Sequence, residues 1–264
     1  MGENKMKITI LGSCSGTEPV TPRHQTSWLL ETEKSIYIFD TGESCSYTAY
    51  RMGIDLLKTK CIFYSHPHLD HTAGLPHLLF LFRKIQTMEN RIMTPPVIYT
   101  PHQEQIHAFL LAASYAESGN FYSSLPVKSV QDGVLFENEE IKVEARHNFH
   151  YGNMETMKEK VWRSFSYRIH CEGKVILFSG DVKGVEDLED WPGTADLFLM
   201  ETGHHDPLEV CRKLEEKFHS SLPHLLFMHH GRRILHNKPF YEEECPKLYH
   251  GKLSIAEDAM TLSL

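Results

Sequence analysis

Short apolar runs alternate with polar turns along the chain, and this pattern predicts a mixture of strands and helices. Residues 7–11 carry several β-branched side chains and end at Gly12. Residues 26–31 and 35–39 flank a polar turn, which predicts a hairpin. The uninterrupted apolar run at residues 61–64 is typical of a strand that is buried on both faces. The first part of the chain therefore predicts strands that end at polar or small residues.

Helix signals separate these strands. A short helix is expected after residue 42 and should end near Gly53, a natural residue beyond a helix C-terminus. Residues 75–82 are dense in Leu and Phe and predict a buried helix. Thr100 is expected to cap a further helix, with Pro at its first position, that runs through about Glu117.

The rest of the chain continues this arrangement of strands and helices. Further strands are expected at residues 97–99, 141–145, 164–170, 174–178, 196–200 and 225–228. Asp206, followed by Pro207 and by Glu209, predicts a capped helix start. Residues 254–257 have the form of a helix capping box, although a strand is the alternative there. Intermixed strands and helices indicate a layered α/β protein. The length of 264 residues is within the range of one domain, and we expect a single domain over residues 1–264.

Composition and charge limit the possible partners. Hydrophobic residues make up 41% of the chain and charged residues 23%, which is ordinary for a globular protein. The formal net charge of −8 gives the surface no general attraction for nucleic acid. The neighbouring Arg232 and Arg233 could bind a phosphate locally, or could be an ordinary solvated pair.

The cysteines and the apolar runs indicate the cellular compartment in which the protein is expected. Six scattered cysteines without a C-x-x-C pair predict reduced thiols in a cytoplasmic protein. Neither a signal sequence nor an apolar run near 18 residues is recognisable, so we expect neither export nor a membrane span.

Histidine is abundant, at 18 residues, and one group of histidines follows the strand at residues 61–64 directly. In an extended segment residues two apart point the same way, so His66 and His68 could bind one cation together. Asp70 and His71 follow in a turning segment and could face a second cation. Imidazole and carboxylate ligands suit zinc, and also manganese or iron.

The segment His66-Pro67-His68-Leu69-Asp70-His71 resembles the signature of the metallo-β-lactamase superfamily. The resemblance covers nearly the whole chain and is strongest to the ribonuclease Z-like and phosphodiesterase branch. It rests on Gly12-Ser13, Asp40-Thr41-Gly42-Glu43, Gly74-Leu75-Pro76, Ser166-Tyr167-Arg168-Ile169, Gly180-Asp181, Ala195-Asp196-Leu197 and the strand that ends at His229. It implies a four-layer αββα sandwich of the metallo-β-lactamase type.

The resemblance also implies a site with two divalent metal ions, most simply Zn²⁺, with Mn²⁺ or Fe²⁺ as alternatives. The implied metal ligands are His66, His68, Asp70, His71, His150, Asp181 and His229, with Asp181 bridging the two ions. His147 is the alternative to His150. His230 is the alternative to His229, and only one of these two strand neighbours should point to the metals.

The implied reaction is hydrolysis by a metal-activated water. Asp70 would bind a metal and also accept the proton of the water. A histidine before the helix at Asp206 would protonate the leaving group. His205 is preferred for this role over His204.

The expected substrate is a small or cyclic phosphodiester, such as a cyclic nucleotide or a cyclic ribose phosphate. A ribonuclease Z-like RNA endonuclease is the alternative, but residues 151–163 are too short and too evenly charged for a basic RNA-binding arm. Hydrolysis of an ester, lactone or thioester, or metal binding without catalysis, are further alternatives. A homodimer is a possibility that the resemblance raises.

Overall fold

The computed structural model describes residues 6–116, 122–152 and 162–264. The chain divides into two compact units. The first unit contains the described part of Met1–Ser13 together with Thr21–Val130 and Asp258–Ser263, and the second contains Cys14–Val20 and the described part of Gln131–Glu257.

The first unit is built on a seven-stranded sheet in the described part of the chain, with the order β14-β1-β2-β3-β4-β5-β6. Its strands are β1 (Lys7–Gly12), β2 (Ser27–Glu31), β3 (Ile36–Phe39), β4 (Thr59–Phe63), β5 (Val97–Thr100), β6 (Val127–Ser129) and β14 (Thr261–Ser263). The neighbours from β14 to β3 are antiparallel, and those from β3 to β6 are parallel. The carboxyl ends of β3, β4 and β5 therefore lie at the same edge of the sheet.

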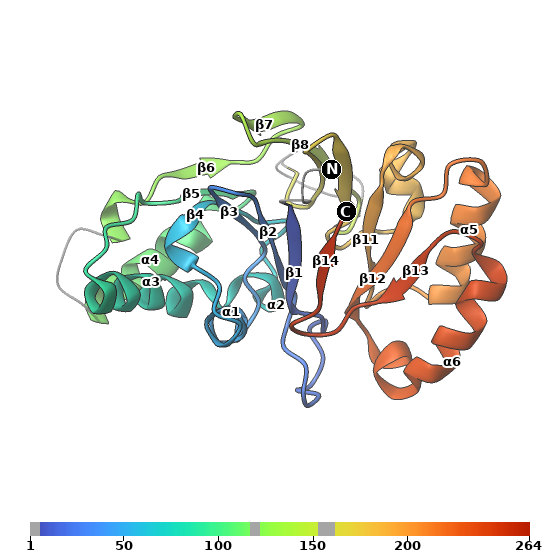
Figure 1. Ribbon diagram of the computed structural model, residues 1–264, viewed down its shortest axis with the longest axis horizontal. Helices are drawn as coiled ribbons and strands as arrows, with labels where there is room; N and C mark the ends of the chain where they lie inside the picture. Colours follow the sequence, from blue (N-terminus) through green and yellow to red (C-terminus); the bar gives the residue numbers. More distant parts are fainter. Residues whose placement is uncertain (1–5, 117–121, 153–161) are drawn as a thin grey trace. The chain divides into compact units, whose positions relative to one another are not determined.

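Helices cover one face of this sheet (Figure 1). They are α1 (Cys45–Arg51), α2 (Leu69–Thr72), α3 (Leu75–Glu89) and α4 (Gln103–Ala116), with short 3-10 helices η1 (Leu56–Lys58) and η2 (Tyr122–Ser124). The core beneath them joins Ile38 and Ile62 of the strands to Leu79 of α3 and Ile106 of α4. Burial of this apolar face stabilises the strand ends that carry polar residues.

The second unit has a sheet of the same size within its described residues, with the order β13-β12-β11-β10-β9-β8-β7. Its strands are β7 (Gly133–Glu137), β8 (Ile141–His147), β9 (Phe165–Cys171), β10 (Lys174–Phe178), β11 (Leu197–Thr202), β12 (His224–His230) and β13 (Leu253–Ile255). Here too an antiparallel part, β7 to β10, continues into a parallel part, β10 to β13. The ends of β10, β11 and β12 consequently lie at one edge.

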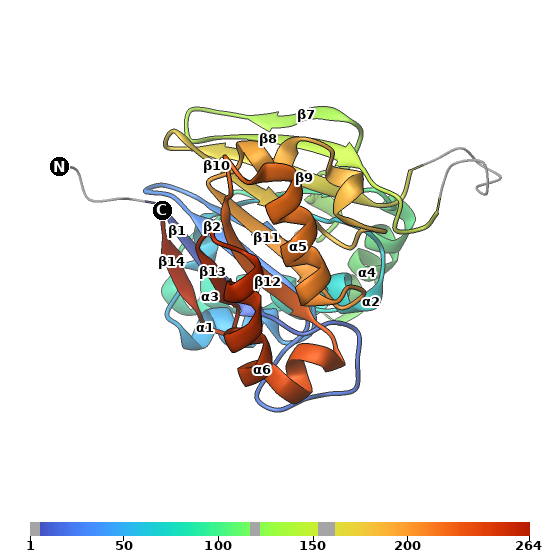
Figure 2. The ribbon, with the colours of Figure 1, turned by 90° about the vertical axis from the view of Figure 1, so that its right-hand side faces the viewer.

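Two long helices, α5 (Pro207–Phe218) and α6 (Arg232–Leu248), lie side by side in front of the parallel strands in Figure 2. The 3-10 helices η4 (Val185–Leu188) and η5 (Trp191–Thr194) complete this layer. Leu214 of α5 and Tyr241 of α6 pack in one core with Phe198 and Phe227 of the sheet.

Several predicted elements are confirmed, together with the turn and capping residues that were expected to begin or end them. The hairpin of β9 and β10 turns at Glu172 and Gly173, which both have positive φ values of 49° and 76°. Helix α5 begins as predicted, because the side chain of Asp206 accepts a hydrogen bond from the Leu208 N–H at 2.9 Å. Gly53, with φ of 71°, follows the end of α1.

Other predictions of local structure were wrong. Thr100 does not cap α4, because it belongs to β5 and its hydroxyl accepts the His102 N–H. The His102 ring instead accepts the Gln105 N–H at 3.3 Å, and α4 begins at Gln103. The predicted helix end near Glu117 lies outside the described residues.

Two further differences concern the length and the type of elements. Helix α3 extends to Glu89, seven residues beyond the predicted end, as an amphipathic segment in which Ile85 is buried. The capping box at residues 254–257 does not start a helix, since residues 253–255 form strand β13 beside β12.

None of the helices in the described residues is long and apolar enough to span a membrane. All six cysteines lie in the described part of the chain, where they are buried and form no disulfide.

Candidate metal site

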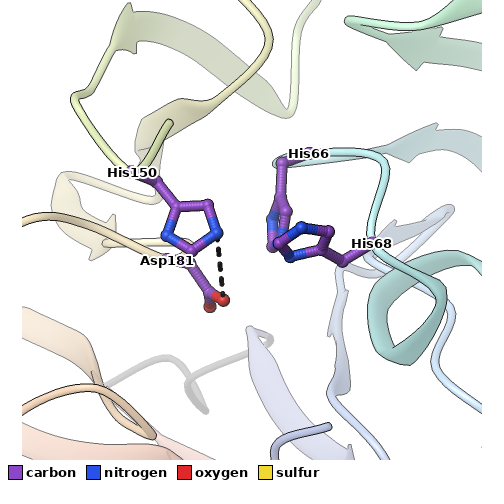
Figure 3. A group of neighbouring side chains, drawn as sticks. All are labelled: His66, His68, His150 and Asp181. Carbon is purple, nitrogen blue, oxygen red and sulfur yellow. Dashed lines mark hydrogen bonds and ion pairs between the residues drawn. The ribbon is translucent and has the colours of Figure 1, made fainter. Parts of the chain in front are cut away.

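In the first unit the histidine group lies at the end of β4. The buried strand ends at Phe63, and the extended backbone that follows places His66 and His68 side by side. His66 Nε2 is 2.9 Å from His68 Nδ1, and the two rings meet edge to face in Figure 3, with centroids 4.6 Å apart. The predicted convergence of these two imidazoles is confirmed.

Asp70 and His71 lie on the single turn of α2 that follows. His71 Nε2 is 3.6 Å from a carboxylate oxygen of Asp70. On its other side the ring meets Asp40, with 2.7 Å between His71 Nδ1 and Asp40 Oδ2. His66 and His71 are fully buried, whereas His68 is exposed.

Asp40 is a residue of this site that sequence reasoning did not assign. It follows β3 in a left-handed conformation, with φ of 55°, and is fully buried. Its carboxylate accepts hydrogen bonds from the Ser65 N–H at 2.8 Å and from the Ser65 hydroxyl at 2.7 Å. Asp40 therefore fixes the orientation of His71. The signal that could have identified it is an acidic residue directly at the end of a buried strand.

In the second unit the ends of β10, β11 and β12 bring a second group together. One possible ligand atom from each of Asp181, Glu201, His204 and His229 lies within 4.8 Å of the others. Asp181, Glu201 and His229 are almost completely buried. His150 belongs to the same region, because its Nε2 lies 3.9 Å from Asp181 Oδ2 along the dashed line in Figure 3.

The structure separates His150 from its alternative, His147. His147 turns away to Asp132, with 2.7 Å between His147 Nδ1 and Asp132 Oδ2. Its ring also stacks on Trp162 at a centroid distance of 3.8 Å. The geometry agrees with the preference for His150, whose role as a ligand remains a prediction.

The two histidines that end β12 also differ. His229 Nε2 is 3.4 Å from Asp181 Oδ1, and His229 Nδ1 is 3.7 Å from Glu201 Oε2. Both ring nitrogens of His230 have other contacts, with the Thr202 hydroxyl at 3.0 Å and the Ala256 carbonyl at 2.9 Å. His229 thus points into the acidic group, in a left-handed conformation with φ of 50°. Such backbone conformations concentrate at functional sites.

Glu201 is the second residue that sequence reasoning did not assign. It is the centre of the group, with oxygens 3.0 Å from His204 Nδ1 and 3.1 Å from His205 Nε2. Burial alone would raise its pKa, but the hydrogen bonds from His204, His205 and His229 outweigh burial and hold the pKa well below its ordinary value.

The pKa values of His204 and His205 shift in the opposite direction, upward. The hydrogen bond to Glu201 raises the pKa of His204. Burial by itself would lower the pKa of His205, but Glu201 raises it overall. His204 is the more accessible, with 47% of its side chain exposed against 18% for His205, whose Nε2 also contacts the Val182 carbonyl.

Arg232 and Arg233 do not form a joint anion site. Arg232 pairs with Glu18 at 2.8 Å, and Arg233 faces Asp206 at 3.8 Å. Both arginines are largely exposed, as expected of a solvated pair.

The donor sets of both units fit divalent metal ions. Each unit combines imidazole nitrogens with carboxylate oxygens, the ligand types of catalytic zinc sites. In the second unit the buried carboxylates of Asp181 and Glu201 lie close together, and a cation would offset their repulsion. In the first unit Asp40 supplies the carboxylate contact that typically orients a ligand histidine.

Comparison with solved structures shows the fold. The solved metallo-β-lactamase fold protein YhfI from Bacillus subtilis superposes with a TM-score of 0.74 at 17% identity, over 97% of this chain and 98% of that one. A diphosphatase of the PhnP family superposes with a TM-score of 0.67 at 18% identity, over 98% of both chains. The predicted α/β class and metallo-β-lactamase fold are confirmed. The ribonuclease Z of Treponema pallidum (strain Nichols) is 41% identical over 92 residues, which cover 34% of this chain and 29% of that protein.

These likenesses show that the chain has the metallo-β-lactamase fold and that part of it is similar to a ribonuclease Z. The chain belongs to the family described as Anti-Pycsar protein Apyc1, whose model matches residues 6–238.

Proposed function

We propose that the protein hydrolyses phosphodiesters, with a small or cyclic phosphodiester as its preferred substrate. The observation that carries this proposal is the pair of buried histidine and carboxylate groups at the strand ends of the two units. The names of its relatives, a ribonuclease and a diphosphatase, support chemistry at phosphorus.

The proposed cofactor is a pair of divalent metal ions, preferably Zn²⁺, with Mn²⁺ or Fe²⁺ as alternatives. The residues that would hold the ions are His66, His68, Asp70 and His71 of the first unit and His150, Asp181 and His229 of the second. Bound divalent ions supply an activated water and stabilise charge on phosphoryl oxygens. On this proposal residues 1–264 act as one catalytic domain.

The side chains around the ligands have distinct proposed roles. Asp70 accepts a proton from the attacking water, since its carboxylate is partly exposed on the turn of α2. Asp40 keeps His71 oriented through the 2.7 Å contact with its Nδ1. Protonation of the leaving oxygen falls to His205 or His204, which Glu201 holds in place. Single substitutions of these two histidines decide between them.

The preference for a small substrate rests on charge. The net charge of −8 disfavours a polyanion. The segment 151–163, too short for an RNA-binding arm, lies mostly outside the described residues. The chain spans 29% of the length of the Treponema ribonuclease Z, so that enzyme's activity does not transfer directly. RNA cleavage is the second candidate.

Three further properties belong to the proposal. The buried thiols without disulfides support a cytoplasmic protein. A homodimer is proposed on the resemblance to related phosphodiesterases alone. The description of the family, Anti-Pycsar protein, supports a role directed against Pycsar.

A substrate panel tests the function. The protein, purified and loaded with Zn²⁺ or Mn²⁺, is assayed on bis-p-nitrophenyl phosphate, 3′,5′-cyclic nucleotides, a precursor transfer RNA and p-nitrophenyl acetate. We expect turnover of the small phosphodiesters. Turnover of the acetate alone would assign an esterase, and faster cleavage of the RNA would assign the second candidate.

A further inference from the structure

A glutamine of α4 contacts the backbone between two of the candidate metal ligands. Gln105 Nε2 donates a hydrogen bond of 2.7 Å to the carbonyl oxygen of Pro67. Pro67 is the residue between His66 and His68. Only the amide nitrogen can donate to a carbonyl, so this contact fixes which way the Gln105 amide faces. The other amide atom, Oε1, is buried, and no group in the described part of the chain donates to it.

The buried Oε1 of Gln105 makes this arrangement costly for the fold. A buried acceptor without a partner destabilises the folded protein, whereas an apolar side chain of similar size does not carry this cost. Gln105 is followed by Ile106, which is fully buried in the core of the first unit. Methionine would therefore be sufficient for packing at position 105. A polar side chain that is present at a cost in stability indicates a role other than packing.

The hydrogen bond acts on the one backbone angle that proline leaves free. Pro67 has no N–H and its ring fixes φ, so the direction in which the chain enters His68 depends on ψ of Pro67. The carbonyl that Gln105 holds belongs to the peptide group that this angle orients. On the other side, the His68 carbonyl accepts hydrogen bonds from the His71 N–H at 3.1 Å and the Thr72 hydroxyl at 3.0 Å. Both peptide groups that flank the His68 side chain are therefore held by hydrogen bonds.

His68 is the candidate ligand that gains most from this support, since burial does not hold its side chain. It is exposed, whereas His66 and His71 are fully buried. Its Nδ1 nevertheless lies 2.9 Å from His66 Nε2, so the two imidazoles meet at one point (Figure 3). An exposed ligand loses its orientation when its backbone moves, and the metal affinity falls with it.

We propose that Gln105 is a positioning residue of the metal site, which fixes the Pro67 carbonyl and thereby aims the His68 side chain. The inference rests on the proposed pair of divalent metal ions and adds to it a residue of α4 that is not a ligand. Gln105 contacts neither the ion nor the substrate on this proposal. Its effect is therefore expected in the metal affinity and in the geometry around the bound ion, and not in the stability of the fold.

Substitution at position 105 separates positioning from packing. We expect Gln105→Met to lower the Zn²⁺ affinity, measured by competition with a chromophoric chelator, about 10-fold. The urea midpoint of the metal-free protein should equal or exceed that of the wild type, because methionine leaves no buried acceptor unsatisfied. Gln105→Glu, which places a carboxylate oxygen against the Pro67 carbonyl, should weaken the affinity at least as much. Gln103→Met, at the start of the same helix, is the control and should bind Zn²⁺ normally.

Two spectra complete the test. Gln105→Met should change the visible absorption of the Co²⁺-loaded protein, which reports the arrangement of the ligands. In the metal-free protein it should shift the amide resonance of His68, because the Pro67 carbonyl belongs to the same peptide group. A lower urea midpoint with wild-type Zn²⁺ affinity, or an unchanged His68 resonance, would overturn the inference. Absence of metal binding by the wild type would instead refute the proposed cofactor, and the His68 resonance would still decide on Gln105.

Discussion

At the scale of single residues, the motif from His66 to His71 predicted which side chains point together, but not what holds them. The sequence places His66 and His68 two apart after a buried strand, and this suffices to predict their convergence. Asp40 and Glu201 were not predicted, because each contacts histidines that only the fold brings near it. Carboxylates at strand ends are common, and the spacing of residues along the sequence does not predict which side chains they contact.

The support that Asp40 gives to His71 is open to direct test. Asp40→Asn keeps the shape of the side chain but removes its charge, so the His71 ring becomes a weaker ligand. We expect metal affinity to fall about 10- to 100-fold with the circular dichroism unchanged. Asp55→Asn, which alters an exposed carboxylate of the same unit, is the control. Equal metal affinity in Asp40→Asn and the wild type would contradict the role.

Gly203 leaves the space in which the His229 ring lies. A Cβ at this position would be 2.5 Å from His229 Nδ1 and 3.1 Å from Ser15 Cβ. We therefore expect Gly203→Ala to displace the ring and to lower the metal content measured by atomic absorption. Gly173→Asn, at an open turn position that Asn tolerates, should bind metal normally. Full metal content in Gly203→Ala would exclude His229 as a ligand.

At the scale of elements, predictions succeeded where a short sequence carries its own geometry. The Glu172–Gly173 turn and the Asp206 cap need only neighbouring residues. The Thr100 cap failed because pairing with β6 extends β5 through Thr100. Helix α6 was not predicted, since it contains Pro239 and Pro246 and a kink at Asn237. Tertiary packing overrides local signals in these cases.

The start of α5 supplies a test of stability. Asp206→Ala removes the acceptor for the Leu208 N–H, so the free energy of unfolding should fall by about 1 kcal/mol in urea denaturation. Asp206→Ser, which retains a capping oxygen, should lose less. An unchanged unfolding midpoint in Asp206→Ala would show that the cap does not stabilise the helix.

His224, at the start of β12, makes stability depend on pH. Burial, followed by the charge of Lys252, lowers its pKa from 6.5 to about 4. The unfolded chain therefore takes up a proton between pH 6.5 and 4 that the folded protein does not. The contribution of His224 to the free energy of unfolding is fully present above pH 6.5. It decreases as the pH falls from 6.5 to about 4.

The His224 contribution is measured by comparing variants. Urea denaturation at pH 7 and pH 5 should show a loss of stability in the wild type that is about 1 kcal/mol larger than in His224→Gln. The glutamine can still contact the Ser254 hydroxyl, which lies 3.0 Å from His224 Nε2. Identical pH dependence in both proteins would rule out a lowered pKa.

At the scale of the whole molecule, one motif and the order of strands were enough to predict the metallo-β-lactamase fold. Each unit repeats an antiparallel part followed by a parallel part, and each places its polar groups at the ends of the parallel strands. The motif and the strand order do not predict the substrate, because one fold can support different reactions. The net charge of −8 is the feature that narrows the substrate class.

The most direct test of the central claim is the turnover of bis-p-nitrophenyl phosphate by metal-loaded protein, compared between the wild type, Asp181→Asn and Asp70→Ala. The account predicts turnover that chelation abolishes, close to two metal ions per wild-type chain, and a loss of at least about 100-fold in both variants. Turnover that persists after chelation, or an unchanged rate in both variants, would contradict a metal-dependent phosphodiesterase.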